Sequence, residues 1–212
     1  MFFNMAAVSQ RPLFAVREPA QIDALGSPAR QEVVDGLQAL GPCSIAELAE
    51  SLGRAPDSLY YHVRKLERVG LVVQRGSRGA GLRREALYDT PGRLVLDHDP
   101  GTARERRRLC RLVGGALRIA ERDIGVALAS GRAVYRRGPR RNAWCARVKG
   151  WLTERELAAV RAHLEAASEL LVRGRKRPGA GLHAVAFVLA PLAPSTRGRR
   201  ASSRRSRNGV SP

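Results

Sequence analysis

The stretch from Ser44 to Tyr88 predicts two short helices joined by a tight turn and followed by a hairpin. Ser44 and Glu47 have the spacing of a capping box at a helix start, and Gly53 ends that helix. Pro56 suits the first position of a second helix, because its missing N–H would have no intrahelical partner there. These closely spaced signals constrain the local fold more than any other feature.

The second helix is expected to bury one stripe and to expose the opposite face. Leu59, Val63 and Leu66 recur at steps of four and three, which is typical of a buried stripe. The other side carries tyrosines and cations with two polar residues beside them: Asp57, Ser58, Tyr60, Tyr61, Arg64, Lys65 and Arg68.

A basic hairpin is expected after this helix, which Gly70 ends. Leu71 to Val73 predicts a β-branched strand and Glu85 to Tyr88 a second one. The glycine-rich connection between them carries the cations Arg75, Arg78, Arg83 and Arg84. The whole unit is typical of a winged helix-turn-helix.

This arrangement indicates double-stranded DNA as the partner, since a major groove admits one α-helix. Residues in the first turns of that helix reach base edges, and cations further along contact phosphates. The hairpin cations suit the DNA backbone or the minor groove. A charged helix face on its own is often only a solvated face, but here a basic hairpin follows directly, which favours DNA.

The run from Ser58 to Val72, which includes Tyr60-Tyr61-His62, resembles the recognition helix of ArsR-type winged-helix regulators in the Tyr-Tyr-His subgroup. The resemblance covers residues 25–90. It implies a homodimeric transcriptional regulator, commonly a repressor. His62 aligns with the family's helix histidine, for which packing beside the core is favoured over a phosphate contact. Metal-sensing members carry paired cysteines near the start of this helix, where this chain has Ala55-Pro56-Asp57, so no metal site is expected there.

The net charge of +19 supports a polyanionic partner, with 38 Lys and Arg against 19 Asp and Glu. Nearly all the cations are arginine, so compositional bias is an alternative cause. A second hypothesis is therefore a nucleoid-type or RNA-binding protein with little sequence preference. A third is an interaction adaptor that uses the fold without DNA.

Other function classes find little support in the sequence. Cys43, Cys110 and Cys145 show neither a disulfide framework nor zinc spacing, which fits a reducing cytoplasm near the nucleoid. Neither a signal peptide nor a membrane span is expected. The histidines show no metal spacing, and no phosphate-binding loop or nucleophile elbow occurs, so we expect no enzyme and no cofactor.

The fold class expected is mainly α with small β elements. Residues 1–21, with Pro12 and Pro19, suggest a flexible arm, and residues 22–92 form the DNA-binding domain. Its first helix begins at Ser27-Pro28 and ends at Gly41. Residues 93–193 are expected to form an α+β dimerisation and effector module with a small antiparallel sheet. Residues 194–212 predict a disordered Arg-rich tail.

A long helix is expected from Thr102, with an apolar stripe through Leu128 that is wider than one winged-helix domain covers. Pairing with the same helix of a second subunit is favoured over packing within the chain's own core. Thr153 and Glu156 form another capping box, which starts a helix that ends near Arg173.

Two strands are predicted around this last helix, at residues 144–152 and 182–192, and they could pair with each other. The first lies in a basic, aromatic stretch that could instead bind single-stranded nucleic acid by stacking; a half-buried strand is favoured. A small-molecule effector is left open. Its pocket would be lined by Trp144, Trp151, His183 and Phe187.

Overall fold

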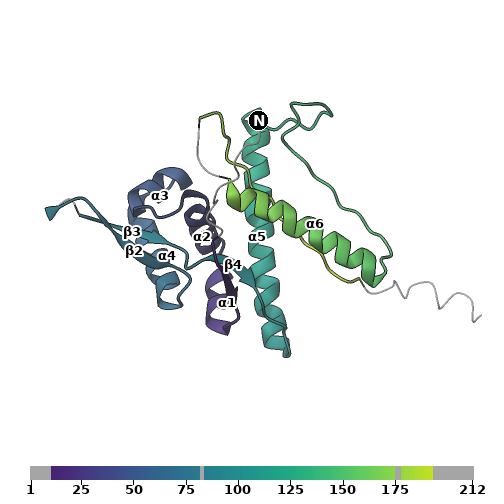
Figure 1. Cartoon of the computed structure of the whole chain (residues 1–212), viewed down its shortest axis with the longest axis horizontal. Helices are drawn as coiled ribbons and strands as arrows, with labels where there is room; N and C mark the ends of the chain where they lie inside the picture. Colours follow the sequence, from purple (N-terminus) through teal and green to yellow (C-terminus); the bar gives the residue numbers. More distant parts are fainter. Residues whose placement is uncertain (1–10, 82–83, 175–177, 193–212) are drawn as a thin grey trace, which may run out of the picture.

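The computed structural model describes residues 11–81, 84–174 and 178–192. It confirms a mainly α fold with small β elements and an N-terminal winged helix-turn-helix (Figure 1). In chain order the elements are β1 (Leu13–Val16), α1 (Pro19–Leu25), α2 (Pro28–Leu40), α3 (Ile45–Leu52), α4 (Pro56–Arg68), β2 (Val73–Arg78), β3 (Glu85–Asp89), β4 (Arg93–Leu96), α5 (Ala103–Ala129) and α6 (Glu154–Arg173).

The helix-turn-helix core lies between α2, α3 and α4. Leu59, Val63 and Leu66 of α4 are buried, as their spacing predicts, and they join Val33 and Leu37 of α2 in one cluster. The capping box at the start of α3 is formed, and Gly53 ends that helix in the left-handed conformation with φ of 61°. The local signals of the sequence are confirmed here because each agrees with the packing around it.

The wing is the antiparallel pair β2–β3, with an irregularity between Gln74 and Gly76. The sequence predicted that the first strand begins at Leu71, but it begins at Val73. Leu71 and Val72 are fully buried in the core instead, directly after α4. The strand then continues to Arg78, through residues that were expected to form the hairpin connection.

The expectation of a flexible arm over residues 1–21 is wrong from residue 11 onward; residues 1–10 lie outside the described part. β1 pairs in parallel with β4, and Val16 is buried. Pro19 stands at the first turn of α1, where a proline stabilises a helix start, and Gln21 completes a capping box with Glu18. The helix that begins at residue 28 is therefore the second of the chain.

Helix α5 packs along its own subunit. Asp23 of α1 forms ion pairs with Arg108 at 3.0 Å and with Arg111 at 3.1 Å. The side chain of Gln31 in α2 donates a hydrogen bond to the Leu112 carbonyl at 2.9 Å. Packing of α5 within its own chain, the less favoured alternative from the sequence, is thus present over this part of the helix.

One buried carboxylate connects α5 to the helix-turn-helix. Glu32 of α2 is buried and forms ion pairs with Arg54, in the turn between α3 and α4, and with Arg122 of α5. A buried charge is tolerated only when it is paired, so these two guanidinium groups hold three elements in register.

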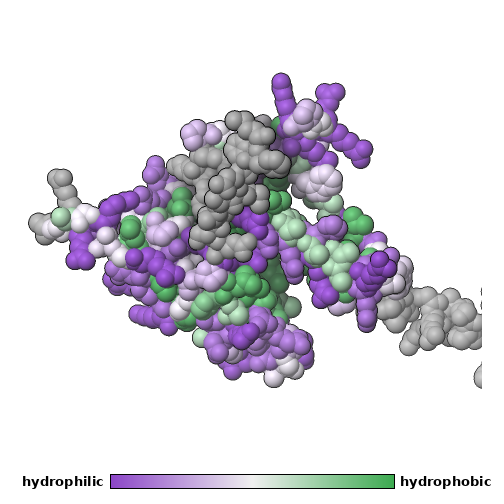
Figure 2. All heavy atoms as spheres, viewed as in Figure 1, coloured by the Kyte–Doolittle hydropathy of each residue, from purple (hydrophilic) through white to green (hydrophobic). Residues whose placement is uncertain are grey.

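The C-terminal half differs from the sequence prediction in its β content. Helix α6 is confirmed, with its Thr153 capping box and its end at Arg173. Residues 144–152 and 182–192 form no strands, because neither stretch has a backbone partner among the described residues. The regular elements described in residues 93–193, which were predicted as an α+β module, are thus β4, α5 and α6, with long irregular segments between and after the helices. The antiparallel sheet in the described part of the chain is the wing. On the face drawn in Figure 2, apolar spheres lie at the surface along α6.

Candidate nucleic-acid interface

The outer face of α4 is exposed along its whole length. Asp57, Ser58 and Tyr60 stand in the first turns, and the cations follow toward the end of the helix. The helix buries its apolar stripe in the core, so this face can point only outward. A shallow, open depression runs over it and is lined by Asp57, Tyr60, Tyr61, Arg64, Lys65 and Arg68.

Within the described residues, Arg64 and Arg68 make no hydrogen bond and no ion pair. Lys65 lies over the ring of Tyr61, 5.4 Å from the ring centroid. The hydroxyl of Ser58 donates to the Ala55 carbonyl at 2.7 Å, which is a local contact at the helix start. The two arginines thus extend from a rigid helix with all their donors available to an external anion.

The wing cations, in contrast, are engaged by the protein. Arg78 forms an ion pair with Glu47 at 3.0 Å and lies 3.7 Å from Glu85. Arg84 donates to the Ser77 hydroxyl at 2.7 Å. Arg83, which the sequence also predicted as a contact, lies outside the described residues.

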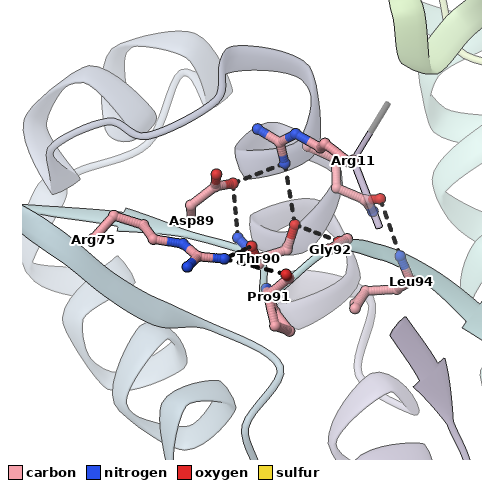
Figure 3. Close-up of polar contacts among 8 residues, drawn as sticks. Arg11, Arg75, Asp89, Thr90, Pro91, Gly92 and Leu94 are labelled. Carbon is pink, nitrogen blue, oxygen red and sulfur yellow. Dashed lines mark hydrogen bonds and ion pairs between the residues drawn. The ribbon is translucent and has the colours of Figure 1, made fainter. Parts of the chain in front are cut away.

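Figure 3 shows Arg75 and Arg11 approaching the turn after β3 from two sides. Arg75 donates to the Pro91 carbonyl at 3.1 Å, and Arg11 forms an ion pair with Asp89 at 2.8 Å. The Thr90 hydroxyl inside the turn donates to the Gly92 carbonyl at 2.8 Å. Arg75 therefore stabilises the base of the wing, a role that its position in the sequence did not indicate.

The pair Arg78–Glu47 links the wing to α3. The pKa of Glu47 is lowered, first by the hydrogen bond from the Ser44 backbone and then by Arg78. The same carboxylate that completes the capping box of α3 thus accepts from a wing arginine. This contact connects the wing to the helix that it flanks. Sequence reasoning missed it, because residues 47 and 78 share no local pattern.

His62 points toward the core side of α4. Its ring is half-buried and meets the ring of Tyr61 edge-on, with centroids 5.4 Å apart. Burial lowers the pKa of His62, and the positive charges of Arg30 and Arg54 lower it further. The Nδ1 atom is buried and has no partner among the described residues. These observations support the packing role and not a phosphate contact.

The remaining candidate groups do not assemble into a site. Within the described residues, no three His, Cys, Asp or Glu side chains stand close enough to hold a metal ion. The Cys43 thiol is buried, and its pKa is raised to about 11, first by that burial and then by Glu47 and Asp89. The predicted effector pocket is not formed in the single chain, since its four members are all exposed: Trp144, Trp151, His183 and Phe187.

Residues 25–75 match the model of a helix-turn-helix domain family, which spans α2, α3, α4 and the start of the wing. No curated protein matches the chain. A solved structure titled "Crystal structure of RV1404 from Mycobacterium tuberculosis" is similar at 18% identity, with a TM-score of 0.26. The match covers 70% of this chain and 82% of that one, and at this score it carries no argument about fold or function. Among the described helices, none is both long and apolar enough to cross a membrane.

Proposed function

We propose that this helix-turn-helix chain is a sequence-specific transcriptional regulator of the ArsR-type winged-helix class that binds duplex DNA as a homodimer. The observation that carries this proposal is the outer face of α4. That face is exposed, it joins tyrosines to cations, and Arg64 and Arg68 have no internal partner among the described residues. Such a face has the shape and the charge of a major-groove reader.

The position of a residue along α4 determines whether it is expected to contact bases or phosphates. Asp57, Ser58, Tyr60 and Tyr61 stand in the first turns, which approach base edges when a recognition helix enters the groove. The cations Arg64, Lys65 and Arg68 lie further along and contact phosphates, which set register and orientation. Base choice therefore resides in the first set, and most of the salt dependence in the second.

The wing contributes to DNA binding with arginines that contact other side chains of the protein. Arg78 and Arg84 are exposed, although each contacts a side chain of the protein. Since Glu47 and Ser77 are only partly buried, a phosphate can compete for the guanidinium groups when DNA arrives. Arg75 acts earlier, by holding the base of the wing in place.

The other parts of the proposal concern the rest of the chain. The DNA-binding domain of residues 22–92 is extended by β1, α1 and β4, which pack onto it. Residues 93–193 serve assembly and could respond to a small-molecule effector, and residues 194–212 lie outside the described part. We propose action in the cytoplasm on the chromosome, with no catalytic step.

A nucleoid-type or RNA-binding protein is the second candidate, and the net charge of +19 favours it. Competition binding at two salt concentrations separates the two functions. A specific regulator keeps its preference for one duplex site as salt rises, whereas a general binder loses affinity for all sequences together. Loss of every preference at the higher salt would reject the regulator.

The double variant Arg64→Ala with Arg68→Ala tests the assigned face. Removing two phosphate contacts should reduce the slope of log K against log salt by about 2 and weaken all sites alike. The matched control is Arg104→Ala with Arg107→Ala, two exposed cations of α5. If the α4 variant binds DNA as the control does, the DNA interface lies elsewhere on the chain. If neither variant nor the wild type binds duplex DNA, the adaptor hypothesis gains.

A further inference from the structure

The C-terminal half of the described chain has no hydrophobic core. The fifteen buried hydrophobic residues of the described part of the chain all lie between Val16 and Val72. Helix α6 has no buried residue, and α5 buries only Gly115. Sixteen of the 21 large hydrophobic side chains that are exposed lie at or after Leu117. An exposed apolar surface of this size indicates a missing partner. The side chains from Leu117 onward therefore lack a covering surface among the described residues, although the first half of α5 packs on α1 and α2.

Two segments carry most of this exposed surface, and we name them the first segment (residues 143–152) and the second segment (residues 182–192). Trp144, Val148 and Trp151 of the first are 72%, 86% and 92% exposed. The second exposes six large hydrophobic side chains: Leu182, Val185, Phe187, Val188, Leu189 and Leu192. Neither segment forms a helix or a strand in the single chain.

The two segments have complementary strand patterns. In the first, Trp144, Ala146 and Val148 alternate with the cations Arg147 and Lys149, which is typical of a strand with one face on a core and one in water. The second is apolar on both faces, as a central strand is. A sheet built from both would place the second segment inside and the first beside it.

We propose that a second copy of this chain covers this surface, and that the first and second segments pair as β-strands across the dimer interface. The amount of surface fits, since sixteen exposed apolar side chains present on the order of 1,000 Å² per chain, and a stable interface buries about 800 Å² per partner. The proposal deepens the proposed function, because it names the surface that makes the regulator dimeric.

The charge distribution is compatible with a second copy at this surface. Two chains of +19 repel each other over most of their surface, but the second segment carries no charged side chain. A two-fold interface is self-complementary, so each copy supplies both a second segment and the first segment that pairs with it. The face of α5 that packs on α1 and α2 of its own subunit is then not part of the dimer contact.

Hydrogen exchange without DNA tests the pairing directly. The full chain is measured at two concentrations that bracket the dimer dissociation constant found by sedimentation. We expect amides of both segments to exchange at least about tenfold more slowly at the higher concentration, together with the shift to dimer. Protection at both concentrations in a monomer would mean pairing within one chain. A dimer with fast exchange in both segments, or a chain that stays monomeric throughout, would overturn the proposal.

The variant Leu182→Asp should be monomeric where the wild type is dimeric, and Leu13→Asp is its matched control. The two leucines are 80% and 65% exposed, so neither change should unfold the chain, and circular dichroism checks this. A dimeric Leu182→Asp variant would overturn the proposal. DNA preference is measured separately, so a wild type that dimerises through these segments but prefers no duplex site would reject the regulator and leave the dimer standing.

Discussion

The two halves of the chain use the same local signals and reach different packing. Ser44 and Glu47 start α3, and Thr153 and Glu156 start α6, with the same reciprocal hydrogen bonds in each capping box. Helix α3 then buries Ile45 and other apolar residues in the core, whereas α6 buries none. Local chemistry thus determines where a helix begins, and the partner surface determines what the helix contributes to stability.

The same contrast applies to the cations. Arg64 and Arg68 stand on a helix whose other face is buried, so they are held in place while their donors stay available. Arg54 and Arg122 form ion pairs with the buried Glu32 and so stabilise the fold. A high arginine content alone therefore does not identify a nucleic-acid interface. The contacts of each arginine distinguish guanidinium groups that are available to a ligand from those that stabilise the fold.

The largest expected difference between the halves is the response to removal of a leucine side chain. Leu66→Ala should lower the free energy of unfolding by about 2–5 kcal/mol, because Leu66 is fully buried and its loss leaves a cavity. Leu170→Ala removes a side chain that is 73% exposed, and it should change that energy by less than about 0.5 kcal/mol in the monomer. Urea unfolding at low protein concentration measures both. Equal losses would show that the C-terminal half has its own core.

A smaller difference is expected for added methyl groups. Gly92→Ala would place a Cβ 2.2 Å from the Pro12 carbonyl oxygen, so β1 and β4 must separate, at a cost of about 1–3 kcal/mol. Gly125 of α5 has open space around its Cβ position, and Gly125→Ala should stabilise the helix by up to about 1 kcal/mol. Thermal unfolding of both variants gives the comparison. A neutral Gly92→Ala would contradict the close pairing of β1 with β4.

The helix-turn-helix could be predicted from the sequence because its signals are local and mutually consistent. The spacing of Leu59, Val63 and Leu66 identified the buried stripe, and with it the exposed face opposite. The arm was missed because its order depends on distant partners: Arg11 pairs with Asp89, and β1 pairs with β4, some eighty residues away. No local pattern marks such contacts.

The prediction of two C-terminal strands was wrong for a related reason. The alternation at residues 144–152 is real, but a strand needs a backbone partner, and the single chain supplies none among the described residues. The sequence also showed no sign of the protein partners of Arg75, Arg78 and Arg84, whose role as DNA contacts stays a prediction. Sequence position placed these groups in the wing but did not indicate which protein groups they contact.

Removal of a helix cap should have a modest effect that again differs between the halves. Ser44→Ala should cost about 1 kcal/mol of global stability, because its side chain accepts a hydrogen bond from the Glu47 amide at the start of a packed helix. Thr153→Ala removes the matching bond to the Glu156 amide, but α6 buries nothing. In the monomer it should only fray the first turn of α6, which hydrogen exchange detects, and leave the global unfolding energy unchanged. A matching global loss would place α6 inside the cooperative unit.

The smallest effect depends on pH and concerns the two histidines His62 and His163. Burial lowers the pKa of His62 below its usual 6.5, so the unfolded chain takes up this proton first as pH falls. Stability from His62 is therefore fully present above pH 6.5 and is lost as pH falls toward the lower, folded-state pKa. The variant His62→Gln should remove this loss, whereas His163→Gln, on exposed α6, should keep it.

Asp35 changes stability in the opposite sense over part of this range. Although its side chain keeps contact with solvent, the surrounding protein atoms and the charges of Glu32 and Asp123 raise its pKa to about 6. Its contribution is common to wild type and both variants, so the difference between them at each pH isolates the histidine. The measurement is urea unfolding of the wild type and both variants at several pH values, from above pH 6.5 down to below the lowered pKa of folded His62. If His62→Gln retains the full acid loss, the ring is not held neutral by the core, and α4 sits more loosely on α2 than the buried stripe requires.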